Sequence, residues 1–198
     1  MKTYLSIDID YWNVFSGTEQ LEKDIPRIIN FANKNYIPIH VVMNHQQLLK
    51  FVNISVARKL VNIDQHSDIV ASPRMLDCGT WVSYVNWRKE GEYLWVRSYK
   101  TLGDVNTWQN KLSHKKNQWK WGCDWKSAER TIYKHASLAL SHLNKNVAGI
   151  GICLSPAYSR ADVYSRARKL LVGVPYVRGR KDENNMRDYR RPSLINRI

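Results

Sequence analysis

Two carboxylates and one imidazole lie within five residues in the segment Asp64-Gln65-His66-Ser67-Asp68. In an extended or tightly turned segment, alternate side chains point the same way, so Asp64, His66 and Asp68 can converge on one point. Oxygen ligands combined with imidazole suit Mn²⁺, Fe²⁺ or Zn²⁺ better than Ca²⁺ or Mg²⁺. The same spacing also arises by chance in polar loops, so this segment alone favours a metal site no more than a solvated loop.

A second pair of acids, Asp8 and Asp10, ends the otherwise apolar segment 3–10. Two like charges on a buried strand repel each other, and burying them without a cation costs free energy. A bound metal ion would remove that cost. The alternative interpretation is a solvated strand end whose acids cap the following helix.

Taken together with His45, which follows the apolar segment 37–43, the two acidic segments resemble the metal-binding motifs of the ureohydrolase (arginase–deacetylase) superfamily. That superfamily binds its metal ions through a D-x-H-x-D segment, a D-x-D segment and one further histidine after a strand. The resemblance implies these metal ligands: Asp8, Asp10, His45, Asp64, His66 and Asp68. In ordinary arginases the D-x-D segment comes second, so the order of the motifs is permuted here. Ligands that converge at one sheet edge can survive a circular permutation, because chain termini usually lie close together.

A closer resemblance is to a divergent branch, the peptide arginases, which convert arginine to ornithine within ribosomally made precursor peptides. The matching segments are 44–46, 62–68, 78–81, 93–96 and 153–156. The resemblance implies a hydrolase with two Mn²⁺ ions, although other divalent metals are possible. One ion would be held by His45, Asp64, Asp68 and Asp8, and the other by His66, Asp64, Asp8 and Asp10.

The resemblance also implies roles for residues around the metal ions. The expected catalytic residues are Asp10, His66 and Asp162, and the expected substrate-binding residues are Asp77, Thr80 and Ser155. Asp77 and Asp162 are the candidates for the carboxylate that holds the cationic guanidinium. Ordinary arginases carry a proton-shuttling histidine after the D-x-H-x-D segment, whereas residues 69–90 contain no histidine.

The elements that must position these residues alternate along the chain. Apolar patterning predicts strands over 3–10, 37–43, 60–64, 92–98 and 147–155. It predicts helices over 19–35, 45–59, 79–89, 127–145 and 160–171, the first of which accommodates Pro26 only in its first turn. This alternation predicts an α/β fold, a three-layer sandwich with a mainly parallel sheet and an arginase-like architecture. In such sheets the ligand site lies at the carboxyl ends of the strands.

We expect one arginase-like domain over 1–177, with a Trp/Lys-rich insertion at about 99–127 and a basic tail at 178–198. The net charge of +14 predicts an acidic partner, and the resemblance suggests a precursor peptide with an acidic leader.

No apolar run approaches the roughly 20 residues that span a bilayer, and no signal peptide is recognisable, so we expect a cytoplasmic protein without membrane contact. Cys78, Cys123 and Cys153 show no disulfide or zinc spacing.

Other functions remain compatible with the sequence. A metal-dependent nuclease or phosphoesterase would share the acidic metal site, and the basic surface favours it. A non-enzymatic nucleic-acid-binding protein could use Trp residues and cations in the stretch 108–130, but it leaves the buried acids unexplained. That stretch could equally dock a peptide or bury its Trp residues on itself.

Overall fold

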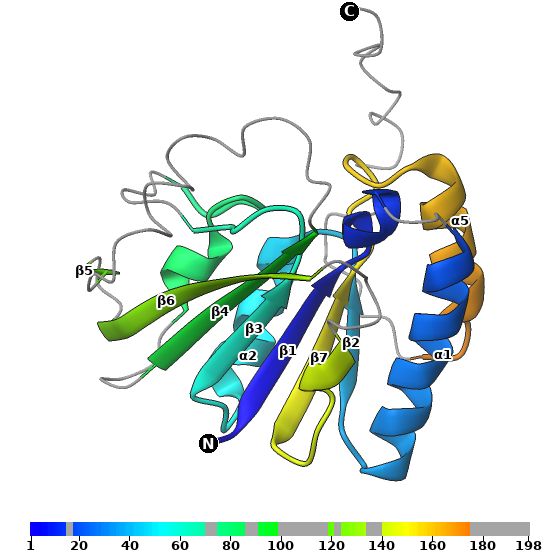
Figure 1. Ribbon diagram of the computed structural model, residues 1–198. Coiled ribbons are helices and arrows are strands. Elements are labelled where there is room, and N and C mark those ends of the chain that lie inside the picture. The colour runs from blue at the N-terminus through cyan, green and yellow to red at the C-terminus, as the bar shows by residue number, and fades with distance from the viewer. Residues whose placement is uncertain are drawn as a thin grey trace, which may run out of the picture.

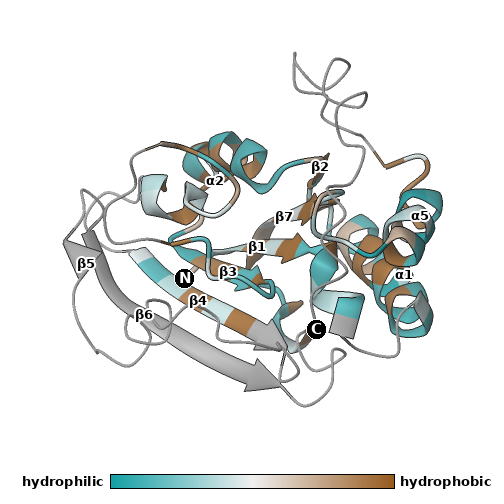
Figure 2. Cartoon of the chain, turned by 90° about the horizontal axis from the view of Figure 1, so that it is seen from above, coloured by the Kyte–Doolittle hydropathy of each residue, from teal (hydrophilic) through white to brown (hydrophobic). Residues whose placement is uncertain are grey.

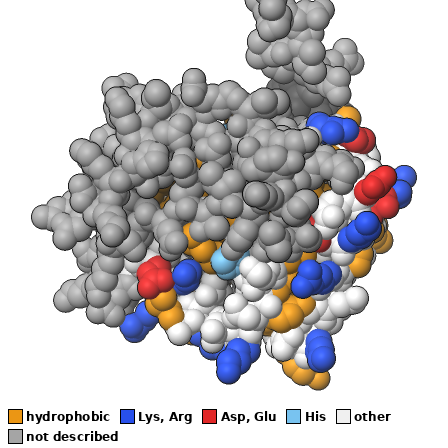
Figure 3. All heavy atoms as spheres, viewed as in Figure 1, with side chains coloured by type: hydrophobic (Ala, Val, Ile, Leu, Met, Phe, Trp, Pro, Cys, Tyr) orange, Lys and Arg blue, Asp and Glu red, His pale blue; other side chains and the backbone are white. Residues whose placement is uncertain are grey.

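A computed structural model describes residues 1–14, 18–69, 75–85, 91–98, 119–120, 124–133 and 140–174. Most of the predicted Trp/Lys-rich insertion and the whole of the predicted basic tail lie outside these residues. Within them, no helix is long and apolar enough to cross a membrane. On the face drawn in Figure 3, Lys and Arg side chains gather along the lower edge.

One sheet joins the strands of the described residues, in the spatial order β2-β7-β1-β3-β4-β6-β5 (Figure 1). The strands are β1 (Thr3–Asp8), β2 (Ile39–Val42), β3 (Lys59–Ile63), β4 (Gly91–Ser98), β5 (Trp119–Lys120), β6 (Asp124–Tyr133) and β7 (Val147–Cys153). Neighbouring strands from β2 to β6 pair in parallel, and β5 pairs antiparallel with β6. The predicted α/β class with a mainly parallel sheet is confirmed.

Helices cover both faces of the sheet and give the three layers (Figure 2). On one face lie α1 (Thr18–Lys34) and α5 (Ala161–Leu170), and on the other lies α2 (Leu49–Ile54). Four short 3₁₀ turns complete the described elements: η1 (Ile9–Val14), η2 (His45–Leu48), η3 (Trp81–Tyr84) and η4 (Leu140–His142). An ion pair between Arg166 and Glu22 joins the two helices of the first face.

The two-residue period of β1 sorts its side chains between two apolar cores. Leu5 and Ile7 belong to the core beneath α1 and α5. Tyr4 belongs to the core beneath α2, η2 and η3. Ser6 and Asp8 share the parity of Tyr4, so this alternation directs the polar end of the strand towards η2.

Gly151 of β7 allows η2 to lie directly against the sheet. A Cβ atom at this position would come within 2.6 Å of both terminal methyl carbons of Leu48. Because real Cβ contacts are never that short, a larger residue would push the buried Leu48 away. The close approach brings His45, at the start of η2, over the carboxyl ends of the strands.

The predicted helix over 127–145 is wrong over 127–133, because β6 spans Asp124–Tyr133. β6 pairs with β4 from Glu92↔Ser127 to Ser98↔Tyr133. The apolar residues Ala128 and Ile132 are four apart, which fits both a helix and a strand, so the spacing did not discriminate. Residues 140–142 form η4, and 134–139 lie outside the described residues.

Other predicted boundaries also differ. The predicted helix over 45–59 is shorter, because η2 and α2 end at Ile54. The described part of the predicted helix 79–89 contains only η3. The predicted strand 3–10 ends at Asp8, and Asp10 lies in η1. Pro26 lies inside α1 and not in its first turn. In the helix interior proline removes one backbone hydrogen bond, and the buried apolar face of the helix must offset this loss.

Candidate metal centre

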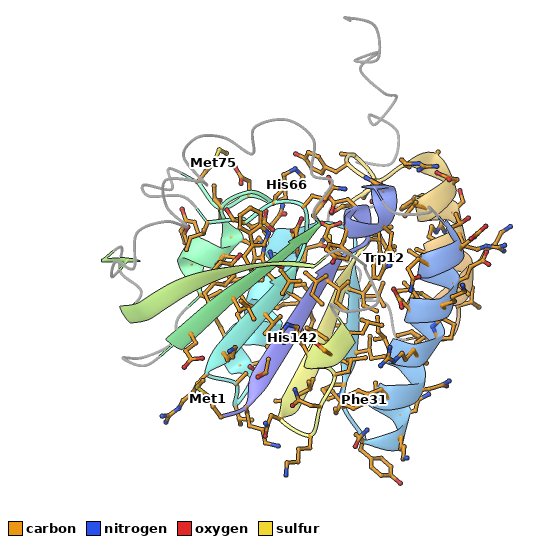
Figure 4. All side chains as sticks on the ribbon, viewed as in Figure 1. Met1, Trp12, Phe31, His66, Met75 and His142 are labelled. Carbon is orange, nitrogen blue, oxygen red and sulfur yellow. The ribbon has the colours of Figure 1, made fainter. Side chains whose placement is uncertain are left out.

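The acids and histidines meet at the carboxyl edge of the sheet because neighbouring parallel strands end at the same height. Ile7 of β1 pairs with Ile63 of β3, so the residues that follow them, Asp8 and Asp64, lie side by side. On the other flank of β1, Asp8 pairs with Cys153 at the end of β7. Figure 4 shows His66 at this edge, at the end of the sheet opposite to Met1.

His45 is buried at the centre of three carboxylates. Its Nδ1 atom lies 2.7 Å from Asp68 Oδ2, 3.1 Å from Asp64 Oδ2 and 3.4 Å from Asp8 Oδ2. Its other ring nitrogen, Nε2, lies 2.7 Å from the hydroxyl oxygen of Ser6. Ser6 therefore fixes the ring so that Nδ1 faces the acids, an arrangement common for metal-binding imidazoles.

His66 forms a second group with two of the acids. Its Nδ1 atom lies 3.3 Å from Asp10 Oδ2 and 3.5 Å from Asp64 Oδ1. Asp64 thus directs one carboxylate oxygen to each histidine. Within each group, His45–Asp64–Asp68 and Asp10–Asp64–His66, the ligand atoms lie within 4.8 Å of one another, so each group could hold a metal ion. The side chain of His66 is 49% exposed, whereas that of Asp64 is 1% exposed, so the cluster opens to solvent on the His66 side.

Hydrogen bonds from neighbouring elements hold the acids in place. The indole N–H of Trp81 in η3 donates to Asp68 Oδ2 at 2.7 Å, and the hydroxyl of Ser155 donates to Asp8 Oδ2. Asp68 and Ser155 both have left-handed backbone conformations, with φ of 52° and 37°. Such conformations cost roughly 1–3 kcal/mol each in residues other than glycine, and they gather where the surrounding structure fixes a functional group.

Burial disfavours the charged form of three of the carboxylates and raises their pKa values. Loss of solvent raises the pKa of Asp10 to about 6, and the charge of Asp64 adds to the shift. Burial and the charge of Asp64 also raise the pKa of Asp68 to about 7. Burial, with the charges of Asp10 and Asp64, raises the pKa of Asp8 well above its ordinary value. These carboxylates therefore lack sufficient positive charge from the protein itself.

The two imidazoles respond in the opposite direction. Hydrogen bonds with Asp10 and Asp64 raise the pKa of His66 to about 12. Burial alone would lower the pKa of His45, but the charge of Asp68 and hydrogen bonds with Asp64 and Asp68 raise it well above its ordinary value. Burial opposes ionisation of Asp64 too, yet hydrogen bonds from both histidines hold its pKa below the usual range. The acids thus attract positive charge to the positions that metal ions would fill.

The cluster fits divalent cations on two independent grounds. Asp10 Oδ1 is buried and has no hydrogen-bond partner within the described part of the chain, which is costly for a carboxylate oxygen unless a cation binds it. The buried acids of the cluster are Asp8, Asp10, Asp64 and Asp68, and their combined negative charge equals the positive charge of two divalent ions. Carboxylates and imidazoles are also the donor set of Mn²⁺, Fe²⁺ and Zn²⁺ sites.

The remaining residues predicted for the site are placed differently. Ser155 lies in the cluster through Asp8, as described above. Asp77 and Thr80 lie on a loop after Asp68, where Asp77 Oδ1 accepts the N–H of Gly79. The hydroxyl of Thr80 accepts the N–H of Asp77 and donates to the Met75 carbonyl, so it fixes the loop. Asp162 is half-exposed in the first turn of α5.

Asp162 forms a two-point ion pair with Arg160, with one nitrogen–oxygen distance of 2.7 Å. The contacts described for it therefore do not join it to the carboxylate–histidine cluster. Its predicted role in holding the guanidinium stays a prediction, but its charge is already paired with a cation of this chain.

Sequence reasoning missed the residues that support the ligands. Ser6 offered a signal, because it is the polar residue two positions before Asp8 on an otherwise apolar strand and so shares its face. Trp95 donates its indole N–H to the Asp64 carbonyl at 3.1 Å, and Tyr93 donates its hydroxyl to the Ser67 carbonyl. Trp81 and Trp95 lie in two of the segments that resemble peptide arginases, but the resemblance assigns no role to either residue.

Comparisons with protein-family models, with curated proteins and with solved structures found no match for the chain. The class that the fold and the cluster define is an α/β protein with a buried carboxylate–histidine centre at the carboxyl edge of a parallel sheet.

Proposed function

We propose that the protein is a metal-dependent hydrolase of the ureohydrolase type, which converts arginine side chains of a precursor peptide to ornithine and releases urea. The observation that supports this proposal best is the sharing of Asp64 between His45 and His66. A carboxylate that directs one oxygen to each of two imidazole-containing groups is suited to bridge two metal ions.

The residues would divide between two Mn²⁺ ions as follows. His45, Asp68, Asp64 and Asp8 would hold the more buried ion, and His66, Asp10, Asp64 and Asp8 the ion nearer to solvent. Two such ions supply Lewis acidity, which lowers the pKa of a shared water towards neutrality. The distances from His45 to its three acids favour the first set.

The chain's own residues would orient the metal ligands. Ser6 orients His45, and Ser155 and Trp81 orient Asp8 and Asp68. Asp10 Oδ1 has no hydrogen-bond partner among the described residues, so it is available to bind the ion nearer to solvent. The reaction adds water across one C–N bond of the guanidinium: oxygen joins the carbon, urea leaves, and the side-chain nitrogen takes the proton.

A peptide substrate is supported by the charge of the chain. The net charge of +14 repels free arginine at long range but attracts an acidic leader segment that brings the target arginine to the site. We place this reaction in the cytoplasm, where the precursor would be made and where thiols such as Cys78 and Cys153 stay reduced.

The test is urea release after reconstitution with Mn²⁺, measured with an arginine-containing peptide that carries an acidic leader and with free arginine. A labelled oligonucleotide is incubated in parallel, because a metal-dependent nuclease or phosphoesterase is the alternative that the basic charge favours. Urea release from the peptide supports the proposal. Oligonucleotide cleavage without urea release would replace it with the nuclease.

A further inference from the structure

An exposed tyrosine lies beside the half-exposed histidine of the metal centre. The side chain of Tyr158 is 55% exposed, and its ring centroid lies 5.8 Å from that of His66, with the ring planes inclined by 60°. The two rings therefore flank the side on which the cluster opens to solvent, near the edge where Figure 4 places His66.

The chain fixes Tyr158 at several points. The backbone N–H of Tyr158 donates to the Ser155 carbonyl at 2.9 Å. Ser155 has a left-handed backbone conformation, and its hydroxyl donates to Asp8, so this turn links Tyr158 to the cluster. The Tyr158 carbonyl accepts the side-chain amide of Asn13 at 2.9 Å. The Tyr158 hydroxyl lies 3.5 Å from the sulfur of Cys78, on the loop after Asp68. The ring is therefore held next to the centre before any ligand arrives.

A guanidinium that approaches this side needs a partner other than the metal ligands. When two divalent ions balance the buried carboxylates, the centre has no net negative charge left to hold a cation. Asp162 is already paired with Arg160, whereas the N–H of Gly79 that Asp77 accepts is uncharged and does not neutralise the Asp77 carboxylate. The face of an aromatic ring attracts a planar cation without adding charge to the site.

We propose that Tyr158 is a substrate-binding residue whose ring face holds the guanidinium of the target arginine beside His66. This inference rests on the proposed function, and it names the group that selects the substrate. The ring supplies the attraction, whereas the hydroxyl anchors the ring to Cys78. Removal of the ring should weaken substrate binding, and removal of the hydroxyl alone should have a small effect.

The experiment compares Tyr158→Leu with Tyr158→Phe in the Mn²⁺-loaded protein. Tyr36→Asn serves as the control, because Tyr36 is 96% exposed and its left-handed backbone suits asparagine. For each variant we measure KM and kcat for urea release. We also measure binding of the arginine peptide and of the same peptide with citrulline, a neutral analogue. Elemental analysis reports the metal content.

Loss of a cation–π contact should raise KM and the Kd of the arginine peptide about 5- to 30-fold in Tyr158→Leu. Tyr158→Phe should recover most of that affinity, and kcat and metal content should change little in either variant. Citrulline-peptide binding should be insensitive to Tyr158→Leu, because a neutral group gains little from the ring face.

The outcomes separate this inference from the proposed function. Urea release with an unchanged KM and Kd in Tyr158→Leu overturns the role of Tyr158 and leaves the hydrolase intact. Arginine-peptide binding that depends on Tyr158 without urea release supports the role and overturns the hydrolase. A wild-type protein that neither binds the arginine peptide in preference to the citrulline peptide nor releases urea overturns both.

Discussion

Replacement of Asp10 by asparagine should stabilise the metal-free protein while it weakens metal binding. Asp10 is 1% exposed, and its Oδ1 atom has no hydrogen-bond partner in the residues that the structure describes. Burial and the charge of Asp64 raise its pKa from 3.8 to about 6. The ionised carboxylate therefore destabilises the folded protein, and a neutral amide of the same shape removes that strain.

The size of the effect follows from the shift in pKa. The difference of about 2 units between 3.8 and 6, at 1.36 kcal/mol per unit, corresponds to about 3 kcal/mol. Because the folded pKa lies above the unfolded one, this destabilisation is absent below pH 3.8, grows between pH 3.8 and 6, and is complete above pH 6. The gain for Asp10→Asn should therefore approach about 3 kcal/mol at pH 7.5 and nearly vanish at pH 4.

The assay is denaturant unfolding of wild type and Asp10→Asn in a chelator at pH 7.5 and pH 4, repeated with Mn²⁺. An ion present at 100 times its Kd adds about 2.7 kcal/mol to the wild-type free energy of unfolding, and the variant should lose much of this gain. Asp24→Asn is the matched control. Asp24 is also buried, but it accepts hydrogen bonds from Trp12 and Gln20, so Mn²⁺ should stabilise this variant as it does wild type.

The reasoning is refuted if metal-free Asp10→Asn is less stable than wild type at pH 7.5 and yet gains full stabilisation from Mn²⁺. That result would mean that Asp10 is neither strained nor a ligand. A gain of the same size at pH 4 would also contradict the electrostatic origin, because wild-type Asp10 is then protonated in the folded protein.

Four further outcomes are expected. Elemental analysis after reconstitution should approach two Mn²⁺ per chain, and a value near zero would contradict the site. Ser6→Ala should weaken metal binding about 10- to 100-fold in titrations, because His45 loses the hydroxyl that orients its ring. Mn²⁺ affinity should fall as the pH is lowered from 7 to 5, because protons compete for Asp68, with a pKa of about 7, and for Asp10, with a pKa of about 6. High salt should raise KM for an acidic-leader peptide, because it screens charges beyond about 8–10 Å, whereas single turnover of bound peptide should be less affected.

Several features could be predicted from the sequence because they depend on neighbouring residues. The apolar runs of β1, β3 and β7 gave the parallel α/β class, and polar residues directly after them marked the carboxyl edge of the sheet. The D-x-H-x-D spacing from Asp64 to Asp68 similarly indicated convergence within one short segment. Both the apolar runs and the D-x-H-x-D spacing can be recognised without knowing which distant residues they contact.

Local patterns failed where a distant partner decided the conformation. The segment over Asp124–Tyr133 has spacing compatible with a helix, yet it lies as β6 beside β4, whose edge supplies the backbone partners. Pro26 disfavours a helix interior by its own chemistry. The buried face of α1, which includes Leu21, Ile25 and Ile28, packs into the core and offsets that cost.

Only the tertiary structure decided how the centre is assembled. Asp8 and Asp64 are far apart in the chain and meet because β1 and β3 pair in register at Ile7 and Ile63. The contacts of Ser6 with His45, of Trp81 with Asp68 and of Tyr158 with His66 likewise join separate elements. Sequence spacing specifies which residues share a face of one strand or turn, but hydrogen-bond register between strands and the close approach at Gly151 determine which faces meet.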